Sequence, residues 1–367
     1  MSASQTASPD WIYKLDPYMP GKPPEEVERE LGIIGVIKLA SNENPYGPSP
    51  AAIAAMEAAA RRVHLYPDAA GYALRQAISA AFAVPAEEVL LGNGSAEIIK
   101  QLVVAFCSAD DHAVISEFAF IAYKLALDTF GVPTTVVPSL NFGHDLHAMA
   151  AACTDKTRLL FVANPNNPTG THLSHEQLEA FLHAVPEHVL VVLDEAYIEY
   201  RADGSAPTGL DLRALRPNMV VTRTFSKAYA LAGLRIGFAF APPYVAERFN
   251  RSRDAFNTNL VAQEAAIASL ADAGYLHTST AKTRAVLATF SEALTAMGIG
   301  FVPSHGNFVL IDAPMGGKAL FDALLREGVI TRPLTPYNMP KHLRISIGTA
   351  EEMERCAAAL NRVWKQA

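Results

Sequence analysis

Lys227 is the residue of this sequence whose surroundings point most directly to chemistry. It ends the segment Thr222-Arg-Thr-Phe-Ser-Lys227, which continues an apolar run, and mostly apolar residues follow it. Lysines usually lie on solvated surfaces, and loss of hydration lowers the pKa of an amine and prepares it for imine formation. Arg235 lies eight residues further on, close enough to bind a phosphate with its planar guanidinium. A lone Ser-Lys pair is a weak signal, but Arg235 and the flanking glycines make it a strong one.

A carboxylate, Asp194, directly follows Val189-Leu-Val-Val-Leu193, an apolar run without a polar residue, and Tyr197 comes three residues later. A buried carboxylate is costly unless it meets a positive partner or several hydrogen-bond donors. A protonated pyridine nitrogen would be such a partner. Taken alone, Asp194 is better explained as a helix N-cap or as half of a salt bridge.

The segment Leu91-Gly-Asn-Gly-Ser-Ala-Glu97 opens a predicted amphipathic helix at Ser95–Cys107. Its glycines let the backbone approach a ligand, and the free amides of a helix start can hold a phosphate. Taken alone, an ordinary turn capped by Ser95 explains the segment somewhat better. Glu97 replaces the third glycine of the dinucleotide-binding motif, which disfavours a dinucleotide.

The segment Asn164-Pro-Asn-Asn-Pro-Thr-Gly170 follows the apolar run Leu159–Ala163. Prolines and asparagines at this density give a rigid loop whose amide side chains can donate hydrogen bonds. Its place after a predicted strand makes a binding role about as well supported as a bare turn. Together, these four segments offer partners for a phosphate, a pyridine nitrogen, a phenolic oxygen and an aldehyde, and this combination indicates pyridoxal 5'-phosphate (PLP).

Short apolar runs alternate with amphipathic helical stretches from about residue 50, which predicts an α/β fold with a doubly wound, mostly parallel sheet. In such sheets ligands bind beyond the carboxyl ends of the strands, where the polar segments above are expected to lie. The predicted strands are Val89–Leu91, Ala113–Ser116, Thr135–Val137, Leu159–Ala163, Val189–Leu193, Val220–Thr222 and Ile236–Phe240.

The 367 residues suffice for about two domains. Residues 1–48, rich in proline, are predicted to be an extended arm that joins the small domain. Residues 49–248 form the large PLP-binding domain, and residues 249–367 form a smaller α+β domain. That domain begins with a long helical region to about Gly298 and has strands near Asn307–Asp312 and Leu343–Ile347.

The composition excludes several classes of function. A net charge of −7 argues against a general nucleic-acid or membrane-surface role. Three scattered cysteines and an N-terminus without a basic and apolar leader predict a cytoplasmic protein with reduced thiols. The pairs His144/His147 and His172/His175 lie beside turns and lack a Cys or carboxylate partner, so we expect solvated histidines and no metal.

Several long motifs resemble those of the fold-type I PLP-dependent aminotransferases, and within them the histidinol-phosphate branch. The likeness covers nearly the whole chain. The motifs are NPNNPTG (164–170), LDEAY (193–197), RTFSKAYALAGLRIG (223–237), LRISIG (343–348), PYMPGKPPEEVERELGI (17–33), IKLASNENPYGPSP (37–50) and LYPDAAGYALRQAI (65–78).

The resemblance implies a role for each matching residue around the cofactor. Lys227 would hold PLP and act as general acid and base, and Asp194 would keep the ring nitrogen protonated. Asn167 and Tyr197 would hydrogen-bond the phenolic oxygen, while Phe120 would stack on the ring. The phosphate would be cradled by Ser95, Ala96, Thr224, Ser226 and Arg235.

The resemblance also implies a homodimer, in which Tyr66 reaches the cofactor phosphate of the neighbouring subunit. Substrate would meet Tyr18, Asn44, Arg332 and Arg344, with Asn307 a further candidate. The implied reaction is transamination between L-histidinol phosphate and 2-oxoglutarate, a step of histidine biosynthesis. An aromatic amino acid aminotransferase is the alternative, followed by a threonine-phosphate decarboxylase or a non-catalytic PLP-binding regulatory module.

Two positions depart from the family's pattern. The loop before the final arginine reads Pro336-Tyr-Asn-Met-Pro340, where the family commonly has a glycine on each side of the tyrosine, and this difference bears on the substrate. Ala96 stands where an Asp is frequent. The second departure matters less, because a backbone amide can bind the phosphate with either side chain.

Overall fold

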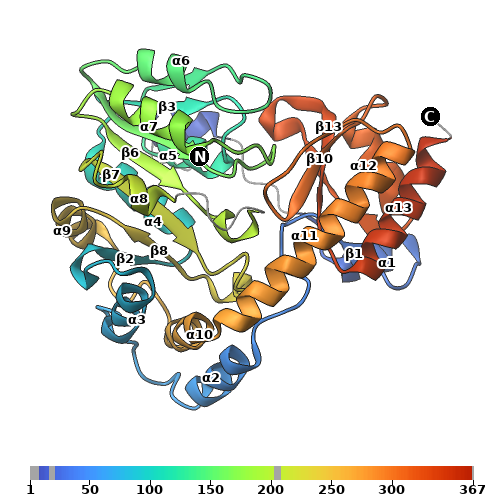
Figure 1. Cartoon of the computed structure of the whole chain (residues 1–367), viewed down its shortest axis with the longest axis horizontal. Coiled ribbons are helices and arrows are strands. Elements are labelled where there is room, and N and C mark those ends of the chain that lie inside the picture. The colour runs from blue at the N-terminus through green and yellow to red at the C-terminus, as the bar shows by residue number, and fades with distance from the viewer. Residues whose placement is uncertain (1–7, 16–20, 202–207, 366–367) are drawn as a thin grey trace, which may run out of the picture.

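A seven-stranded sheet forms the larger part of the molecule (Figure 1). The computed structural model describes residues 8–15, 21–201 and 208–365. The strand order is β2-β8-β7-β6-β5-β3-β4, and neighbours are parallel except where β8 pairs with β2 and β7. The mostly parallel sheet predicted from the sequence is confirmed. Its strands are β2 (Val89–Gly92), β3 (His112–Ser116), β4 (Thr134–Val137), β5 (Thr157–Ala163), β6 (Leu190–Asp194), β7 (Met219–Thr224) and β8 (Gly237–Phe240).

The three central parallel strands end side by side. Ala163 of β5 pairs with Asp194 of β6, and Asp194 pairs with Thr222 of β7. The polar segments that follow these strands therefore start at the same edge of the sheet. This register brings residues far apart in the sequence into one site.

Helices cover both faces of this sheet, as the apolar strands require. Helices α3, α6, α7 and α10 pack with one core cluster, and α4, α5 and α9 pack with the other. Among the described residues, no helix is both long enough and apolar enough to cross a membrane. The helices of this part are α2 (Pro50–Ala60), α3 (Tyr72–Phe82), α4 (Ser95–Phe106), α5 (Ile121–Thr129), α6 (Leu146–Ala151), α7 (His175–Ala184), α8 (Gly209–Leu212), α9 (Pro243–Ser252) and α10 (Leu260–Ala271).

A second, antiparallel sheet with strand order β12-β13-β10-β9 lies in the C-terminal part, on the right in Figure 1. Helix α11 (Ala273–Ala296) runs from the large sheet's side to this part. A third core cluster packs α11, α12 and α13 against the sheet. The remaining elements are β9 (Phe301–Val302), β10 (Phe308–Asp312), α12 (Gly317–Arg326), β11 (Val329–Ile330), β12 (Arg332–Leu334), β13 (Met339–Ser346) and α13 (Ala350–Trp364).

The N-terminal segment is more structured than an extended arm. It contains helix α1 (Pro24–Leu31), which Gly32 ends with a left-handed φ of 65°, and strand β1 (Ile37–Lys38). Strand β1 pairs in parallel with β11, so this segment lies beside the C-terminal part. The domain limits at residues 48 and 248 stay a prediction, and the second falls inside helix α9.

The predicted helical region to about Gly298 contains the end of α9 and helices α10 and α11, whose starts are capped by the side chains of Asn259 and Asp272. One further expectation needs correction. His144 is not a solvated loop histidine. It is buried beside Ala163, whose main-chain oxygen lies 3.0 Å from Nε2, and burial lowers its pKa to about 4.

Candidate active site

A cavity of about 230 Å³ lies beyond the carboxyl ends of β5, β6 and β7, with the C-terminal sheet and the N-terminal segment as its other walls. It collects most of the side chains that the sequence singled out. Those that line it are Ser95, Ala96, Phe120, Asn167, Asp194, Tyr197, Thr224, Ser226, Lys227, Arg235, Arg332 and Arg344.

Lys227 faces this cavity from the turn after β7. Its Nζ donates to the main-chain oxygen of Ser41 at 3.1 Å. Loss of hydration, followed by the positive charge of Arg344, lowers its pKa to about 7. At neutral pH, Lys227 is therefore an uncharged, nucleophilic amine in a large fraction of the protein molecules.

Asp194 ends β6 and is 3% exposed. Its Oδ2 accepts a hydrogen bond from the Tyr123 hydroxyl at 2.7 Å, and its Oδ1 accepts from Thr222 Oγ1 at 3.0 Å and from Ala196 N at 3.2 Å. Burial raises the pKa of Asp194, while these donors act in the opposite direction. A buried carboxylate held by donors in this way is suited to a cationic partner within the cavity.

The start of helix α4 and the turns after β7 form a cradle of donors. Ser95 and Ala96 lie in the first turn of α4, where main-chain amides have no partner within the helix. Arg235 Nη1 donates to Ser226 Oγ at 3.3 Å, and Ser226 N donates to Thr224 Oγ1 at 3.0 Å. Amides, hydroxyls and a guanidinium together fit a phosphate.

Two glycines make the close packing of this cradle possible. A Cβ at Gly94, whose φ is +80°, would lie 2.3 Å from Arg235 Nη2. A Cβ at Gly237 would lie 2.4 Å from the main-chain nitrogen of Ser95. Either side chain would push apart the donor groups of this cradle.

Asn167 and Tyr197 present polar atoms to the middle of the cavity. The Oδ1 of Asn167 accepts from Arg344 Nη1 at 2.6 Å, which leaves the Nδ2 group as the donor for a ligand. The Tyr197 hydroxyl accepts from Asn42 Nδ2 at 2.9 Å. The Phe120 ring lines the same space just before helix α5.

Two arginines face each other across neighbouring strands of the C-terminal sheet. Arg332 of β12 pairs with Arg344 of β13, so both side chains lie on the same face of the sheet and both line the cavity. Arg344 also donates to the main-chain oxygen of Ala40 at 2.6 Å. Like charges directly opposite each other are destabilising, so an anion between them would be bound favourably.

Three expected site residues that the structure describes, Asn44, Asn307 and Tyr66, do not line the cavity. Asn44 donates to Ala228 O at 2.9 Å and to Ser279 Oγ at 2.8 Å, and Asn307 donates to the main chain of the N-terminal segment. Their amide nitrogens donate to other parts of the protein, and their expected contact with substrate stays a prediction. Tyr66 is 82% exposed and stacks on Phe256 at 4.6 Å, and Tyr18 lies outside the described residues.

Sequence reasoning missed Tyr123 and Asn42. Tyr123 lies three residues after Phe120, on the first turn of α5, and from there its hydroxyl reaches Asp194. Asn42 has a φ of 53°, in the left-handed region that asparagine tolerates better than most residues. The spacing of Phe120 and Tyr123 was a usable signal, whereas the contacts of Asn42 depend on residues about 150 to 300 positions away.

Comparison with known proteins shows the family to which the chain belongs. The family described as aminotransferase class I and II matches residues 34–360. The chain therefore belongs to the class I and II aminotransferase family.

Relatives of this chain carry more specific names. A histidinol-phosphate aminotransferase of Anaeromyxobacter sp. (strain Fw109-5) is 50% identical over 97% of this chain and 98% of its own. Histidinol-phosphate aminotransferase 2 of Pseudomonas fluorescens (strain Pf-5) is 46% identical over 97% of each chain. The crystal structure of histidinol-phosphate aminotransferase from Sinorhizobium meliloti in complex with PLP superposes with a TM-score of 0.90, at 30% identity and with full coverage of both chains.

Proposed function

We propose that this aminotransferase binds PLP through Lys227 and transfers an amino group between L-histidinol phosphate and 2-oxoglutarate. The observation that carries the proposal is the opposed pair Arg332 and Arg344 on the substrate side of a cavity that also contains Lys227 and Asp194. The names of full-length relatives support the same reaction.

The residues of the cavity fit PLP group by group. The donors around Arg235 match a phosphate, Asp194 matches a protonated ring nitrogen, and Asn167 and Tyr197 match a phenolic oxygen. Lys227, with its lowered pKa, matches the aldehyde.

PLP supplies an electron sink for the bond that breaks at the carbon bearing the amino group. Lys227 Nζ would hold the cofactor and would also be placed to accept and return a proton, a task suited to a group whose pKa is about 7. Asp194 would hold a proton on the ring nitrogen, and its own position is fixed by Tyr123 and Thr222. Phe120, which lines the cavity, would cover one face of the ring and exclude water from it.

The substrate assignment rests on charge. A phosphate monoester carries nearly two negative charges and suits two guanidinium groups on one face of a sheet. Tyr337 also lines the cavity. Glutamate, the expected amino donor, would place a carboxylate in the same region.

The decisive experiment is a coupled assay of purified protein with 2-oxoglutarate as the acceptor. L-Histidinol phosphate, phenylalanine, tyrosine and threonine phosphate would be compared at equal concentrations. We expect histidinol phosphate to have the highest kcat/KM. An equal or higher kcat/KM for phenylalanine or tyrosine would overturn the substrate and leave the transaminase chemistry in place.

The cofactor link can be tested with Lys227→Ala. Wild-type protein incubated with PLP and then reduced with borohydride should carry one covalently bound cofactor, whereas Lys227→Ala should carry none, because Nζ is the proposed point of attachment. The matched control is Lys38→Ala, which removes a nearby lysine that pairs with Glu43 at 2.8 Å. If Lys227→Ala still carried covalently bound cofactor after reduction with borohydride, the link would have to be assigned to another lysine.

We further propose a homodimer in which Tyr66 binds the cofactor phosphate of the partner subunit. Tyr66 is exposed and does not line the cavity of its own subunit, and both observations support this arrangement. A cytoplasmic location is part of the proposal, since Cys107, Cys153 and Cys356 are free thiols.

A further inference from the structure

Asn42 is buried between the cavity and strand β13, with 1% of its surface exposed. Its backbone has a φ of 53°, which turns the N-terminal segment sharply after Ser41. Asn307 Nδ2 donates to the main-chain oxygens of Asn42 at 3.0 Å and of Glu43 at 3.2 Å, and these bonds stabilise the turn.

The hydrogen bonds of Asn42 form a chain with a fixed direction. Its main-chain N–H donates to Ser346 Oγ at 2.8 Å, and Ser346 Oγ then donates its own proton to Asn42 Oδ1 at 2.9 Å. This contact places the amide oxygen toward Ser346 and the Nδ2 group toward the cavity. Nδ2 therefore donates to the Tyr197 hydroxyl oxygen at 2.9 Å.

The direction of this chain constrains the Tyr197 proton. A hydroxyl that accepts from Asn42 must send its own proton elsewhere. Within the part of the chain that the structure describes, no acceptor for that proton is recorded, and the Tyr197 side chain lines the cavity. The proton is thus directed to whatever occupies the cavity.

We infer that Asn42 is a positioning residue, which, together with Ser346, makes the Tyr197 hydroxyl a permanent donor to the phenolic oxygen of PLP. This inference rests on the proposed function, because it requires PLP in the cavity. Asn42 itself does not have to touch the cofactor or the substrate. It acts by deciding which way the tyrosine proton points.

The charges around Tyr197 are consistent with a donor rather than a phenolate. Burial raises the pKa of Tyr197 to about 12, although Arg344 and the Asn42 bond act in the opposite direction. Asp194 and Tyr337 also face this hydroxyl, and Lys227 Nζ lies 5.7 Å from the centre of the ring. The hydroxyl therefore keeps its proton through the pH range in which the enzyme would work.

The test is a pH titration of the absorbance of the cofactor linked to Lys227, which reads the pKa of the linking nitrogen rather than turnover. When the linking nitrogen has lost its proton, the negative charge of the phenolic oxygen is no longer compensated by that proton. A hydrogen-bond donor to the oxygen therefore stabilises the deprotonated form. Losing the donor should raise the pH midpoint of the titration. Tyr197→Phe, which removes the hydroxyl, sets the reference shift, expected to be about 1–2 pH units for a bond to a charged group.

Two substitutions of Asn42 tolerate its positive φ and separate the possibilities. Asn42→Asp replaces the donor with a carboxylate that accepts the tyrosine proton, so its midpoint should rise at least as far as in Tyr197→Phe. Asn42→Gly frees the hydroxyl to rotate and should give a smaller rise. Ser346→Ala, which releases the far end of the amide, should shift the midpoint in the same direction and serves if an Asn42 variant fails to fold.

Asn44→Ala is the matched control, because Asn44 lies in the same segment and is buried but bonds to Ala228 and Ser279 instead of Tyr197. It should leave the midpoint unchanged. Midpoints of the Asn42 and Ser346 variants that stay within about 0.3 unit of the wild type, or an absence of any shift in Tyr197→Phe, would overturn the inference. A wild-type protein that never develops the absorbance of bound PLP would instead overturn the proposed function.

Discussion

The proposed role of Asp194 requires an ionised carboxylate, but burial of this side chain disfavours ionisation. Burial raises its pKa, and only the bonds from Tyr123, Thr222 and Ala196, together with a cation in the cavity, can hold the ionised form. The three donors fix both carboxylate oxygens before any ligand arrives. Such preorganisation is what an electrostatic partner of a ring nitrogen requires.

We expect Asp194→Asn to retain PLP but to lose turnover by at least about 30-fold, because losing the charged partner of a buried pair costs about 2–5 kcal/mol. An amide cannot hold the ring-nitrogen proton. The control, Thr222→Val, removes one donor and keeps the charge, so its loss should be much smaller. Steady-state kinetics of both variants would decide, and near-normal rates in Asp194→Asn would make the residue a purely structural cap.

The lowered pKa of Lys227 predicts how the protein without cofactor captures PLP at different pH values. The neutral amine is the reactive form, so the capture rate should rise with pH up to about 7 and then level off. An ordinary lysine, with a pKa of 10.5, would keep gaining reactivity through pH 9. Stopped-flow absorbance between pH 6 and pH 9 would measure the profile, and a rate that still climbs tenfold per unit at pH 9 would contradict the lowered pKa.

At the scale of residues, the site residues that could be predicted from the sequence are those whose residue type alone indicates a chemical role. Lys227, Asp194 and Arg235 are charged groups at the ends of apolar runs, and the structure places all three at the cavity. Asn44 and Asn307 were assigned by motif position, yet an amide can serve a ligand or the main chain equally well. Only their partners, which are distant in sequence, reveal that they support the N-terminal segment.

At the scale of elements, the antiparallel pair β12–β13 holds the arginines in fixed register. Arg344 uses its Nη atoms to contact Asn167 and Ala40, so its planar group ties three separate segments together. A lysine would keep the charge but could not reproduce both bonds with one planar group.

We therefore expect Arg344→Lys to lower kcat/KM for histidinol phosphate by one to two orders of magnitude, on the ~1.5–3 kcal/mol typical of a hydrogen bond to a charged group. The control is Arg326→Lys, at an exposed position at the end of α12 that is not part of the cavity. Kinetics at saturating 2-oxoglutarate would measure both. A change of less than about twofold in Arg344→Lys would remove the residue from the substrate site.

The elements found from sequence and those missed differ by their length and surroundings. Strands such as β6, buried on both faces, give an uninterrupted apolar run that is easy to recognise. Strands β1, β9, β11 and β12 have only two or three residues and exist because a partner strand lies beside them. No local pattern identifies strands of that length.

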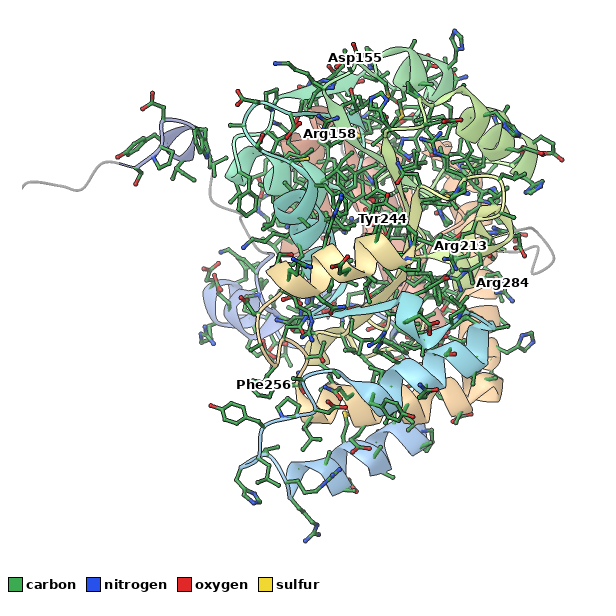
Figure 2. All side chains as sticks on the ribbon, turned by 90° about the vertical axis from the view of Figure 1, so that its left-hand side faces the viewer. Asp155, Arg158, Arg213, Tyr244, Phe256 and Arg284 are labelled. Atoms are coloured by element: carbon green, nitrogen blue, oxygen red, sulfur yellow. The ribbon has the colours of Figure 1, made fainter. Side chains whose placement is uncertain are left out.

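At the scale of the whole molecule, a group of apolar side chains remains exposed around the loop between α2 and α3. Tyr66 stacks on Phe256 at the rim of the molecule, where Figure 2 shows Phe256 above α2. Ile53, Val63 and Leu65 of the same region are also exposed. Exposed apolar groups gathered in this way are typical of an interface, which fits the proposed homodimer.

Hybrid dimers test whether the sites are shared. Lys227→Ala and Tyr66→Phe proteins, each impaired alone, should regain activity when mixed and allowed to exchange, because each hybrid has one site with both defects and one with neither. Random pairing should restore up to about a quarter of the wild-type activity. Sedimentation must show dimers in the mixture, and a fully active monomer would end the proposal.

The walls of the cavity come from both ends of the chain. Ala40 O accepts from Arg344, and Asn42 exchanges bonds with Ser346, so contacts that close the site join residues 304 positions apart. Contacts of such long separation form late, because the chain must first close a very large loop. A nascent chain that has completed the seven-stranded sheet still lacks the arginines and the serine. The enzyme can therefore assemble its substrate side only when almost the entire polypeptide has been made.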